Sequence, residues 1–192
     1  MFLLKDIYWE IKKTKEKGYG VFAKKEIKAG TVISDYLGKV INIAEYDLEK
    51  DKKGLYLMYL NDQACIYPDL SKPGPHLMNH SCVPNCWIYI YHEHTLFFAL
   101  RKIKPGEELT ISYLLSPKDE TCKPCIHDCK CGSKFCTGTI HLSKDKYKRW
   151  QKFQDEEKKK TKTNKFVFGK SLQKLTSYPR IIQNNLIYTS MQ

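Results

Sequence analysis

The stretch Asn79-His80-Ser81-Cys82-Val83-Pro84-Asn85-Cys86 decides how the rest of the sequence is interpreted. It begins with an amide, an imidazole, a hydroxyl and a thiol on four consecutive residues. Ser and Asn side chains compete for backbone hydrogen bonds, and Pro84 has no amide hydrogen to donate, so the stretch disfavours a helix. It favours a rigid loop that presents polar groups to a bound molecule. For the stretch taken alone, a polar turn before the apolar run 87–91 stays open as a simpler interpretation.

On both sides of this stretch, the chain consists mainly of short apolar segments separated by turn residues. The segments that we expect to be strands are 7–12, 32–37, 39–41, 55–60, 87–91, 96–100 and 109–113. Residues 87–91 and 96–100 predict a hairpin across His92-Glu93-His94. The polar segments 44–52 and 145–162 predict helices, and the second carries Trp150 and Phe153 as an anchor to the domain. Many short strands with little helix predict one mainly-β domain.

Length and composition favour one compact domain with an extension. The chain has 192 residues, of which 42% are hydrophobic, enough to bury a core. No run approaches the roughly 18 apolar residues of a membrane span, and the start, Met1-Phe2-Leu3-Leu4-Lys5-Asp6, becomes charged too early for a secretory signal. Eight cysteines in such a chain indicate thiolates for metal rather than disulfides. We therefore expect an intracellular protein.

Positive charge is concentrated in the C-terminal part of the chain. Residues 143–192 hold 13 Lys and Arg against four Asp and Glu, which gives +9 of the total net charge of +12. This distribution indicates a polyanionic partner, such as nucleic acid, near the tail. A solvated, partly disordered lysine-rich end explains the same composition equally well.

Five segments, taken in order along the chain, carry a family resemblance. They are Gly18-Tyr19-Gly20, Tyr36-x-Gly38, Asn79-His80-Ser81-Cys82-x-Pro84-Asn85, Glu108-Leu109-Thr110-Ile111-Ser112-Tyr113 and Cys129-x-Cys131-x4-Cys136. Each segment alone is weak evidence, but the third followed by the fourth is highly specific. Over about residues 5–142, the chain resembles the SET-domain protein-lysine methyltransferases, with no cysteine-rich pre-SET module before the domain.

The resemblance implies a fold and a division of the chain. It implies a β-clip-like SET fold of small curved sheets with short helices, in which residues 79–86 thread beneath residues 109–113 as a pseudoknot. We expect the SET domain over residues 1–121, a zinc-binding post-SET module over 122–142 and a basic, helical C-terminal extension over 143–192. S-adenosylmethionine is expected on one face, with the substrate lysine entering a narrow channel from the opposite face.

The resemblance also assigns candidate site residues. Tyr113 matches the catalytic tyrosine, whose hydroxyl orients the amine near the transferring methyl group. Tyr36 matches a tyrosine of the substrate channel with a supporting catalytic role. The residues that match cofactor contacts are Gly18, Tyr19, Gly20, Asn79, His80 and Tyr113. Outside this context, Tyr113 and Tyr36 would be interpreted as packed strand residues and His80 as a core histidine.

Ile111 stands in the substrate channel where many family members carry Phe or Tyr. An isoleucine cannot hold a water by hydrogen bonding, so the space around a partly methylated amine is expected to be larger and less polar. The sequence therefore predicts di- or trimethylation rather than strict monomethylation. Tyr59 or Tyr67 could fill that space from another strand, which leaves the alternative open.

The cysteines predict a structural zinc site, because such sites are closed by four sulfur or nitrogen ligands. Cys129, Cys131 and Cys136 supply three ligands, and the family pattern takes the fourth from Cys82. The pair Cys122-x2-Cys125 leaves an alternative open, in which a local four-cysteine site forms without Cys82. Cys65 and Cys86 are expected to be buried thiols.

Two functions remain in competition at this point. The first is an S-adenosylmethionine-dependent methyltransferase that acts on a lysine of a histone-like or other basic protein. The second is a catalytically inactive, zinc-stabilised module that binds nucleic acid through its basic tail. In either case we expect no membrane contact, and a nuclear or chromatin-associated location in a eukaryote or a cytoplasmic one otherwise.

Overall fold

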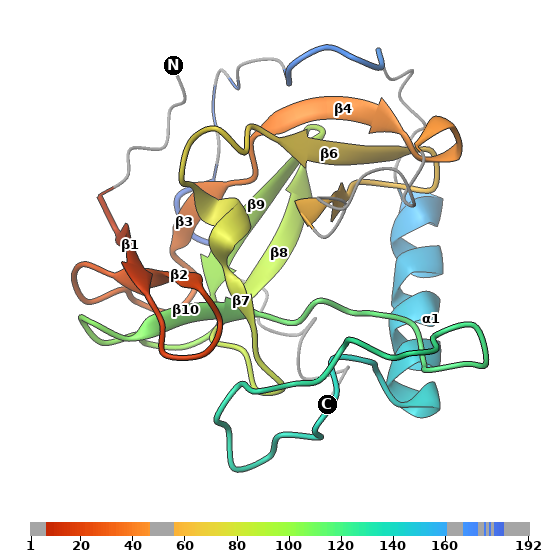
Figure 1. Cartoon of the computed structure of the whole chain (residues 1–192). Helices are drawn as coiled ribbons and strands as arrows, with labels where there is room; N and C mark the ends of the chain where they lie inside the picture. The colour runs from red at the N-terminus through yellow and green to blue at the C-terminus, as the bar shows by residue number, and fades with distance from the viewer. Residues whose placement is uncertain are drawn as a thin grey trace.

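A computed structural model describes residues 7–46, 56–160, 167–172, 175, 177 and 179–182. Its described strands form three small sheets, and one α-helix lies to one side of them (Figure 1). The mainly-β SET-type fold is thereby confirmed. No described helix combines the length and the hydropathy that a membrane crossing requires.

The first sheet contains the stretch that decided the interpretation. Its strands run in the order β1 (Trp9–Lys13), β2 (Tyr19–Ala23), β10 (Glu108–Ile111) and β7 (Asn79–His80). The pairing of β7 with β10 is parallel, with Asn79 opposite Thr110 and His80 opposite Ile111. Beyond β7, the Asn85 side chain donates to the backbone oxygen of Glu108 and accepts from the amide of Thr110. Residues 79–85 therefore lie along β10, as the pseudoknot expectation requires.

The second sheet contains the predicted hairpin and much of the core. Its order is β3 (Val32–Asp35), β9 (His94–Ala99) and β8 (Cys86–Tyr91). The turn between β8 and β9 consists of His92 and Glu93, whose φ angles are 43° and 67°. All six residues of β9 are buried, which makes this strand the centre of the sheet in packing as well as in order.

The third sheet shows where the sequence prediction was incomplete. It contains β4 (Gly38–Asn42), β6 (Ala64–Pro68) and β5 (Met58–Tyr59), with β6 in the middle. We did not predict β6. Of the strand predicted over 55–60, residue 55 lies outside the described residues. Among residues 56–60, Met58 and Tyr59 form β5 and Tyr56 lies in a short helical turn. The helix predicted over 44–52 is a 3-10 turn, Ile43–Glu45, as far as it is described; residues 47–52 lie outside the described residues. A second 3-10 turn, Pro75–Leu77, precedes β7.

The helix α1 (Lys144–Lys160) confirms the helix predicted over 145–162 as far as residue 160, and residues 161 and 162 lie outside the described residues. Ser143 stands before it and accepts a hydrogen bond from the amide of Lys146 through its hydroxyl, a capping interaction. Trp150 packs against the hydrophobic cluster formed by Val32, Trp87, Leu96, Phe98 and Ile182, so the predicted anchor exists. The side chain of Phe153 lies outside the described part of the structure.

Parts of the basic tail return to the domain. The amide of Val40 donates to the Lys170 oxygen at 3.0 Å, and the amide of Val32 donates to the Arg180 oxygen at 2.9 Å. Ile182 is buried, with 7% of its surface exposed. Residues 167–172 and 179–182 are thus bonded to the edges of β4 and β3, so they are ordered against the domain, although most of them are exposed to solvent.

Candidate active site and metal centre

Tyr113 lies just beyond β10 and is held from two sides by the stretch before and within β7. Its amide donates to Nδ1 of His80 at 3.2 Å, and its hydroxyl donates to the Met78 oxygen at 3.1 Å. The His80 and Tyr113 rings meet edge to face, with centroids 5.5 Å apart. Burial and then the nearby Lys17 lower the pKa of His80 to about 4, so this imidazole is neutral at pH 7 and Nδ1 is free to accept.

Three tyrosines surround one region of the site, which we call the tyrosine cluster: Tyr36, Tyr56 and Tyr113. The hydroxyl of Tyr36 donates to the backbone oxygen of Tyr56, and the Tyr36 ring packs edge to face against Phe97. Burial raises the pKa of Tyr36 well above its usual value, with further contributions from Tyr113 and Tyr56. Tyr113 as a whole is 42% exposed, but desolvation of its hydroxyl and then Tyr56 raise its pKa to about 12. Tyr36 and Tyr113 are therefore protonated at neutral pH.

The predicted cofactor residues also converge in the structure. Nδ2 of Asn79 donates to the Tyr19 oxygen at 3.1 Å and to Oε1 of Glu108 at 2.8 Å. Lys17 completes the group through an ion pair with Oε2 of Glu108 at 2.6 Å. A Cβ atom on Gly20 would lie 2.9 Å from Nδ2 of Asn79 and 2.8 Å from Oε1 of Glu108, so a larger residue at this position would displace these two hydrogen-bonded side chains. Tyr19 itself is 58% exposed.

The backbone turn before this group depends on Gly18, whose φ of 71° lies in the left-handed region. Of the three predicted cofactor residues Gly18-Tyr19-Gly20, Tyr19 and Gly20 belong to strand β2. Ile111 is buried, with 6% of its surface exposed, on the strand that leads to Tyr113. Of the two tyrosines considered as substitutes, Tyr67 packs against Tyr46 and Tyr59 packs against Trp150.

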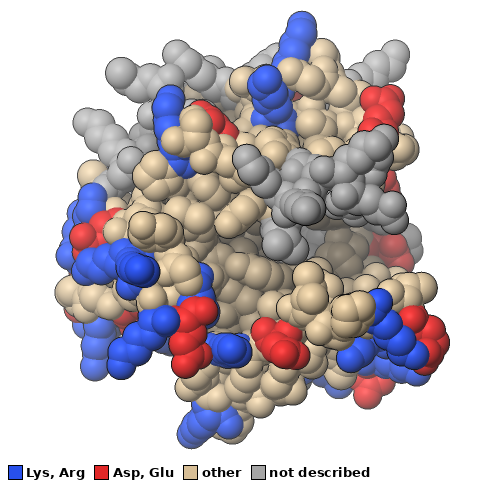
Figure 2. Space-filling view, in the orientation of Figure 1, with Lys and Arg blue, Asp and Glu red and all other residues tan. Residues whose placement is uncertain are grey.

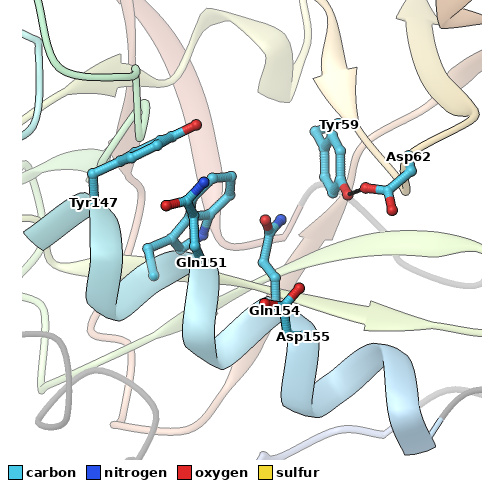
Figure 3. A pocket seen from close by; sticks show the side chains of 7 residues that line it. Tyr59, Asp62, Tyr147, Gln151, Gln154 and Asp155 are labelled. Carbon is cyan, nitrogen blue, oxygen red and sulfur yellow. Dashed lines mark hydrogen bonds between the residues drawn. The ribbon is translucent and has the colours of Figure 1, made fainter.

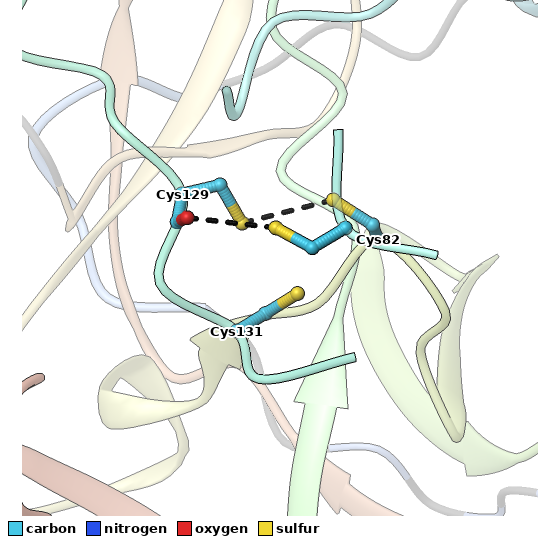
Figure 4. A group of neighbouring side chains, drawn as sticks. Cys82, Cys129 and Cys131 are labelled. Atoms are coloured by element: carbon cyan, nitrogen blue, oxygen red, sulfur yellow. Dashed lines mark hydrogen bonds between the residues drawn. The ribbon is translucent and has the colours of Figure 1, made fainter. Parts of the chain in front are cut away.

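The four cysteines predicted as one metal site are gathered in the structure (Figure 4). Their sulfur atoms all lie within 4.8 Å of one another. The sulfurs of Cys82 and Cys129 are 3.7 Å apart, close to the separation of about 3.8 Å between two thiolates on a tetrahedral zinc with bonds of about 2.3 Å. All eight cysteines are free thiols. Four thiols in this geometry could hold a metal ion, and we call them the four-cysteine cluster.

The four-cysteine cluster lies next to the site, because Cys82 follows His80 by two residues. The sulfur of Cys82 is 3.5 Å from Nε2 of His80. His80 therefore contacts Tyr113 through one ring nitrogen and the cluster through the other. Cys65 and Cys86 are buried, as predicted, and burial raises the pKa of both thiols, that of Cys65 to about 11.

Cys122 and Cys125 belong to neither a four-cysteine site nor the tyrosine cluster. They lie with His127 and His141, and the four ligand atoms are within 4.8 Å of one another. Sequence reasoning missed both histidines. The run Cys122-x2-Cys125-x-His127 was a readable signal, but nothing in the sequence connected His141 to it. Sequence reasoning also missed Tyr56, because its apolar neighbours indicated a strand.

A pocket of about 450 Å³ lies between α1 and the loop after β5 (Figure 3). Its lining residues are Tyr59, Asp62, Tyr147, Trp150, Gln151, Gln154 and Asp155. The hydroxyl of Tyr59 donates to Asp62 at 2.7 Å. Aromatic faces together with carboxylates suit a cationic group. Tyr59, which belongs to the lining, is three residues from Tyr56 of the tyrosine cluster in sequence.

Charged residues of both signs surround the centre of one molecular face. In Figure 2, the described part of this face is hollowed near its middle, and the visible walls of the hollow carry uncharged side chains. Lys and Arg side chains lie around it with Asp and Glu side chains among them. The face therefore has no large area of a single charge where its residues are described.

Comparison with known proteins agrees with the geometry. The family model of the SET domain matches residues 18–114, just over half of the 192 residues. The histone-lysine N-methyltransferase TRX1 of rice is 32% identical over 142 residues, which cover 67% of this chain and 13% of that protein. A variant-silencing SET domain-containing protein of Plasmodium falciparum is 38% identical over 120 residues, covering 54% of this chain and 5% of that protein.

A third relative is the histone-lysine N-methyltransferase, H3 lysine-36 specific, of Coccidioides immitis. It is 36% identical over 141 residues, which cover 67% of this chain and 13% of that protein. The chain thus spans only a small part of the length of the curated relatives that it matches. The match nevertheless contains the tyrosine cluster, the β7–β10 pairing and Asn79 with its partners. This chain belongs to the SET domain family.

Proposed function

We propose that this chain is a protein-lysine methyltransferase that takes its methyl group from S-adenosylmethionine. The observation that carries the proposal is the hydrogen-bonded group of Tyr19, Asn79, His80 and Tyr113. It joins the predicted cofactor residues to the predicted catalytic tyrosine. Those residues come from distant parts of the chain and have no evident reason to converge in a module that only binds.

The tyrosine cluster suits the preparation of a lysine amine for methylation. Free lysine has a pKa of about 10.4, so roughly one side chain in 2,500 is neutral at pH 7. Surrounding the amine with rings removes water and lowers its pKa. Tyr113 and Tyr36 donate their own hydrogens to the backbone oxygens of Met78 and Tyr56. Their oxygen lone pairs therefore remain available to accept hydrogen bonds from the amine and to orient it.

The residues that would hold the cofactor are Gly18, Tyr19, Gly20, Asn79 and His80, with Tyr113 at the reacting end. When bound, S-adenosylmethionine supplies a methyl group that is already activated on a sulfonium. The chain then needs no acid–base pair, and its task is to align the reacting atoms about 3–3.5 Å apart. The absence of a side chain at Gly20 fits this task, because it lets Asn79 approach the backbone of β2.

We further propose that the four-cysteine cluster holds a structural zinc ion. The donor set is closed, and three of its thiols come from residues 129–136, outside the sheets. Binding would fix this loop beside Cys82 and hence beside His80. The zinc would therefore contribute to the cofactor site as well as to folding.

The proposed substrate is a lysine on a histone-like or other basic protein, in a nuclear or chromatin setting. The support is the names of the relatives, which are histone-lysine methyltransferases in several organisms. Those names specify different lysines, H3 lysine-36 in one case and H3 lysine-4 in another, so similarity does not select the target. The pocket beside β5, with Asp62 and Asp155 in its lining, supplies a local complement for a basic substrate.

The direct test is incubation of the full chain with labelled S-adenosylmethionine and a panel of basic proteins. Tyr113→Phe is expected to lower turnover by roughly tenfold or more, because the amine loses the oxygen that orients it. Cofactor affinity, measured by calorimetry, is expected to change little. The matched control is Tyr91→Phe, which removes a hydroxyl from β8, where the ring packs against His92. No label transfer by the unmodified chain, with intact nucleic-acid binding, would favour the binding-module alternative.

A further inference from the structure

Cys122, Cys125, His127 and His141 form a second group of metal ligands, separate from the four-cysteine cluster. We propose that these four residues bind a second structural zinc ion through two thiolates and two imidazoles. We call this group the Cys2His2 cluster. It is independent of methyl transfer, because none of its residues belongs to the tyrosine cluster or to the proposed cofactor site.

The distances in the Cys2His2 cluster match those of a tetrahedral zinc site. Sulfur and nitrogen ligands on one zinc, at about 2.3 Å and 2.0–2.1 Å from it, lie about 3.6 Å apart. The sulfur of Cys122 is 3.4 Å from Nδ1 of His127 and 3.4 Å from Nε2 of His141. The sulfur of Cys125 is 3.9 Å and 3.7 Å from the same two nitrogens. Each thiol therefore faces both imidazoles, and one ion can contact all four atoms.

A backbone hydrogen bond at Nδ1 of His141 leaves its other ring nitrogen, Nε2, available to bind the metal. Nδ1 of His141 is 2.6 Å from the backbone oxygen of Ser116, to which it donates. The neutral ring then carries its hydrogen on Nδ1, so Nε2, the nitrogen that faces both sulfurs, has its lone pair free. A carbonyl partner on the second ring nitrogen is the usual way in which proteins orient a metal-binding histidine.

The backbone holds the segments of the Cys2His2 cluster together. Leu115 and His141 form a parallel bridge, and the amide of Leu142 donates to the Leu115 oxygen at 3.0 Å. The amide of Ile140 donates to the His127 oxygen at 2.9 Å. The two clusters also alternate along the chain, because residues 129–136 of the first lie between His127 and His141 of the second. The second ion would therefore fasten the segment after Tyr113 to the residues that lead into α1.

A disulfide between Cys122 and Cys125 is the competing explanation for this cysteine pair. A disulfide requires no histidine, whereas here two imidazole nitrogens are aimed at both sulfurs. The two explanations predict different metal contents. Zinc content therefore decides between them.

The experiment measures zinc by mass spectrometry in the full chain after purification with zinc and removal of unbound metal. The expected content is two zinc ions per chain. His141→Ala and Cys131→Ser are each expected to leave one ion, and the double variant none. The control is His92→Asn, which changes a histidine in the β8–β9 turn outside both clusters and is expected to keep two ions.

Two further measurements decide the outcome where a variant fails to fold. His141→Cys replaces one ligand by another and is expected to keep two metals. When loaded with cobalt, the His141→Cys variant should show stronger thiolate-to-cobalt charge-transfer absorption than the cobalt-loaded unmodified chain. In the unmodified chain, zinc should slow alkylation of Cys122 and Cys125 at least tenfold relative to the chelator-treated chain. One zinc per chain, equal zinc in His141→Ala and the unmodified chain, or a Cys122–Cys125 disulfide in the zinc-loaded chain would overturn the proposal.

Discussion

Ile111 is the residue that we predict to set how much room surrounds the substrate amine. It is buried on β10 two residues before Tyr113, and the two tyrosines considered as substitutes, Tyr59 and Tyr67, pack against the rings of Trp150 and Tyr46. A methylated amine can then turn its lone pair toward the methyl donor again. We expect a substrate under excess cofactor to carry two or three methyl groups. Mass spectrometry of the product tests this, and a reaction that stops at one methyl group contradicts it.

His80 shows how far residue-level prediction reached. The motif predicted its place beside the cofactor, and its hydrogen bond to the Tyr113 amide fits that role. Its contact with Cys82 follows from the tight loop after β7 and was not predicted. Tyr56 and His141 could not be found from sequence. Tyr56 contributes through a backbone oxygen, and His141 through a bridge to Leu115 that connects residues 26 positions apart.

At the scale of elements, local patterns predicted the β8–β9 hairpin, β10 and α1, because each has a strong apolar or polar pattern of its own. The middle strand of the third sheet, β6, was missed. Its sequence, Ala-Cys-Ile-Tyr-Pro, is short and ends in proline, and it becomes a strand only because β4 and β5 pair with its two edges. The threading of residues 79–86 beneath residues 109–113 came from the family resemblance. The parallel pairing of β7 with β10 was not predicted, since two residues are too few to show a pattern.

The strands β3 and β9 are joined by a buried polar pair. Nδ1 of His94 lies 2.5 Å from Oδ2 of Asp35, and Oδ1 of Asp35 has no hydrogen-bond partner among the described residues. Burial raises the pKa of Asp35, and the interaction with His94 opposes that rise. His94→Ala leaves a buried carboxylate without this partner, so we expect the free energy of unfolding to fall by about 3–5 kcal/mol.

Chemical denaturation of a double-mutant cycle checks this prediction. Asp35→Ala combined with His94→Ala removes both polar groups, so the double variant is expected to lose less stability than the sum of the single variants. Additive losses would show that the two side chains contribute independently. Zinc content serves as the control, since both residues lie outside the two clusters.

At the scale of the whole molecule, the net charge of +12 is carried largely by α1 and the residues after it. Truncation is a poor test of nucleic-acid binding, because residues 167–172 and 179–182 are bonded to β4 and β3. The exposed residues Lys144, Lys148 and Lys152 offer a better one, since a spacing of four places them along one side of α1. Tyr147 and Trp150 of the same helix line the pocket.

We expect substitution of these three lysines by Gln to weaken DNA or RNA binding. The slope of log affinity against log salt is negative, and each lost phosphate contact reduces its magnitude by about 0.9 for double-stranded DNA. The slope of the triple variant should therefore be smaller in magnitude by up to about 2.7. Activity on a short free peptide should stay unchanged, because none of the three lies in the tyrosine cluster. Fluorescence anisotropy over a salt series measures the slope, and an unchanged slope would remove α1 from the nucleic-acid surface.

The parallel pairing of β7 with β10 has a consequence for how the protein is made. Asn79 and His80 reach their partners only after residues 110 and 111 have been synthesised, and β10 must also meet β2 from the start of the chain. Contacts between residues so distant in sequence form slowly, because closing a long loop costs conformational entropy before any hydrogen bond forms to offset that cost. A nascent chain that ends before Cys136 lacks one of the four clustered thiols as well. Assembly of the site therefore comes late, and any pause in translation before that point leaves its polar and thiol groups exposed to chaperones and oxidants.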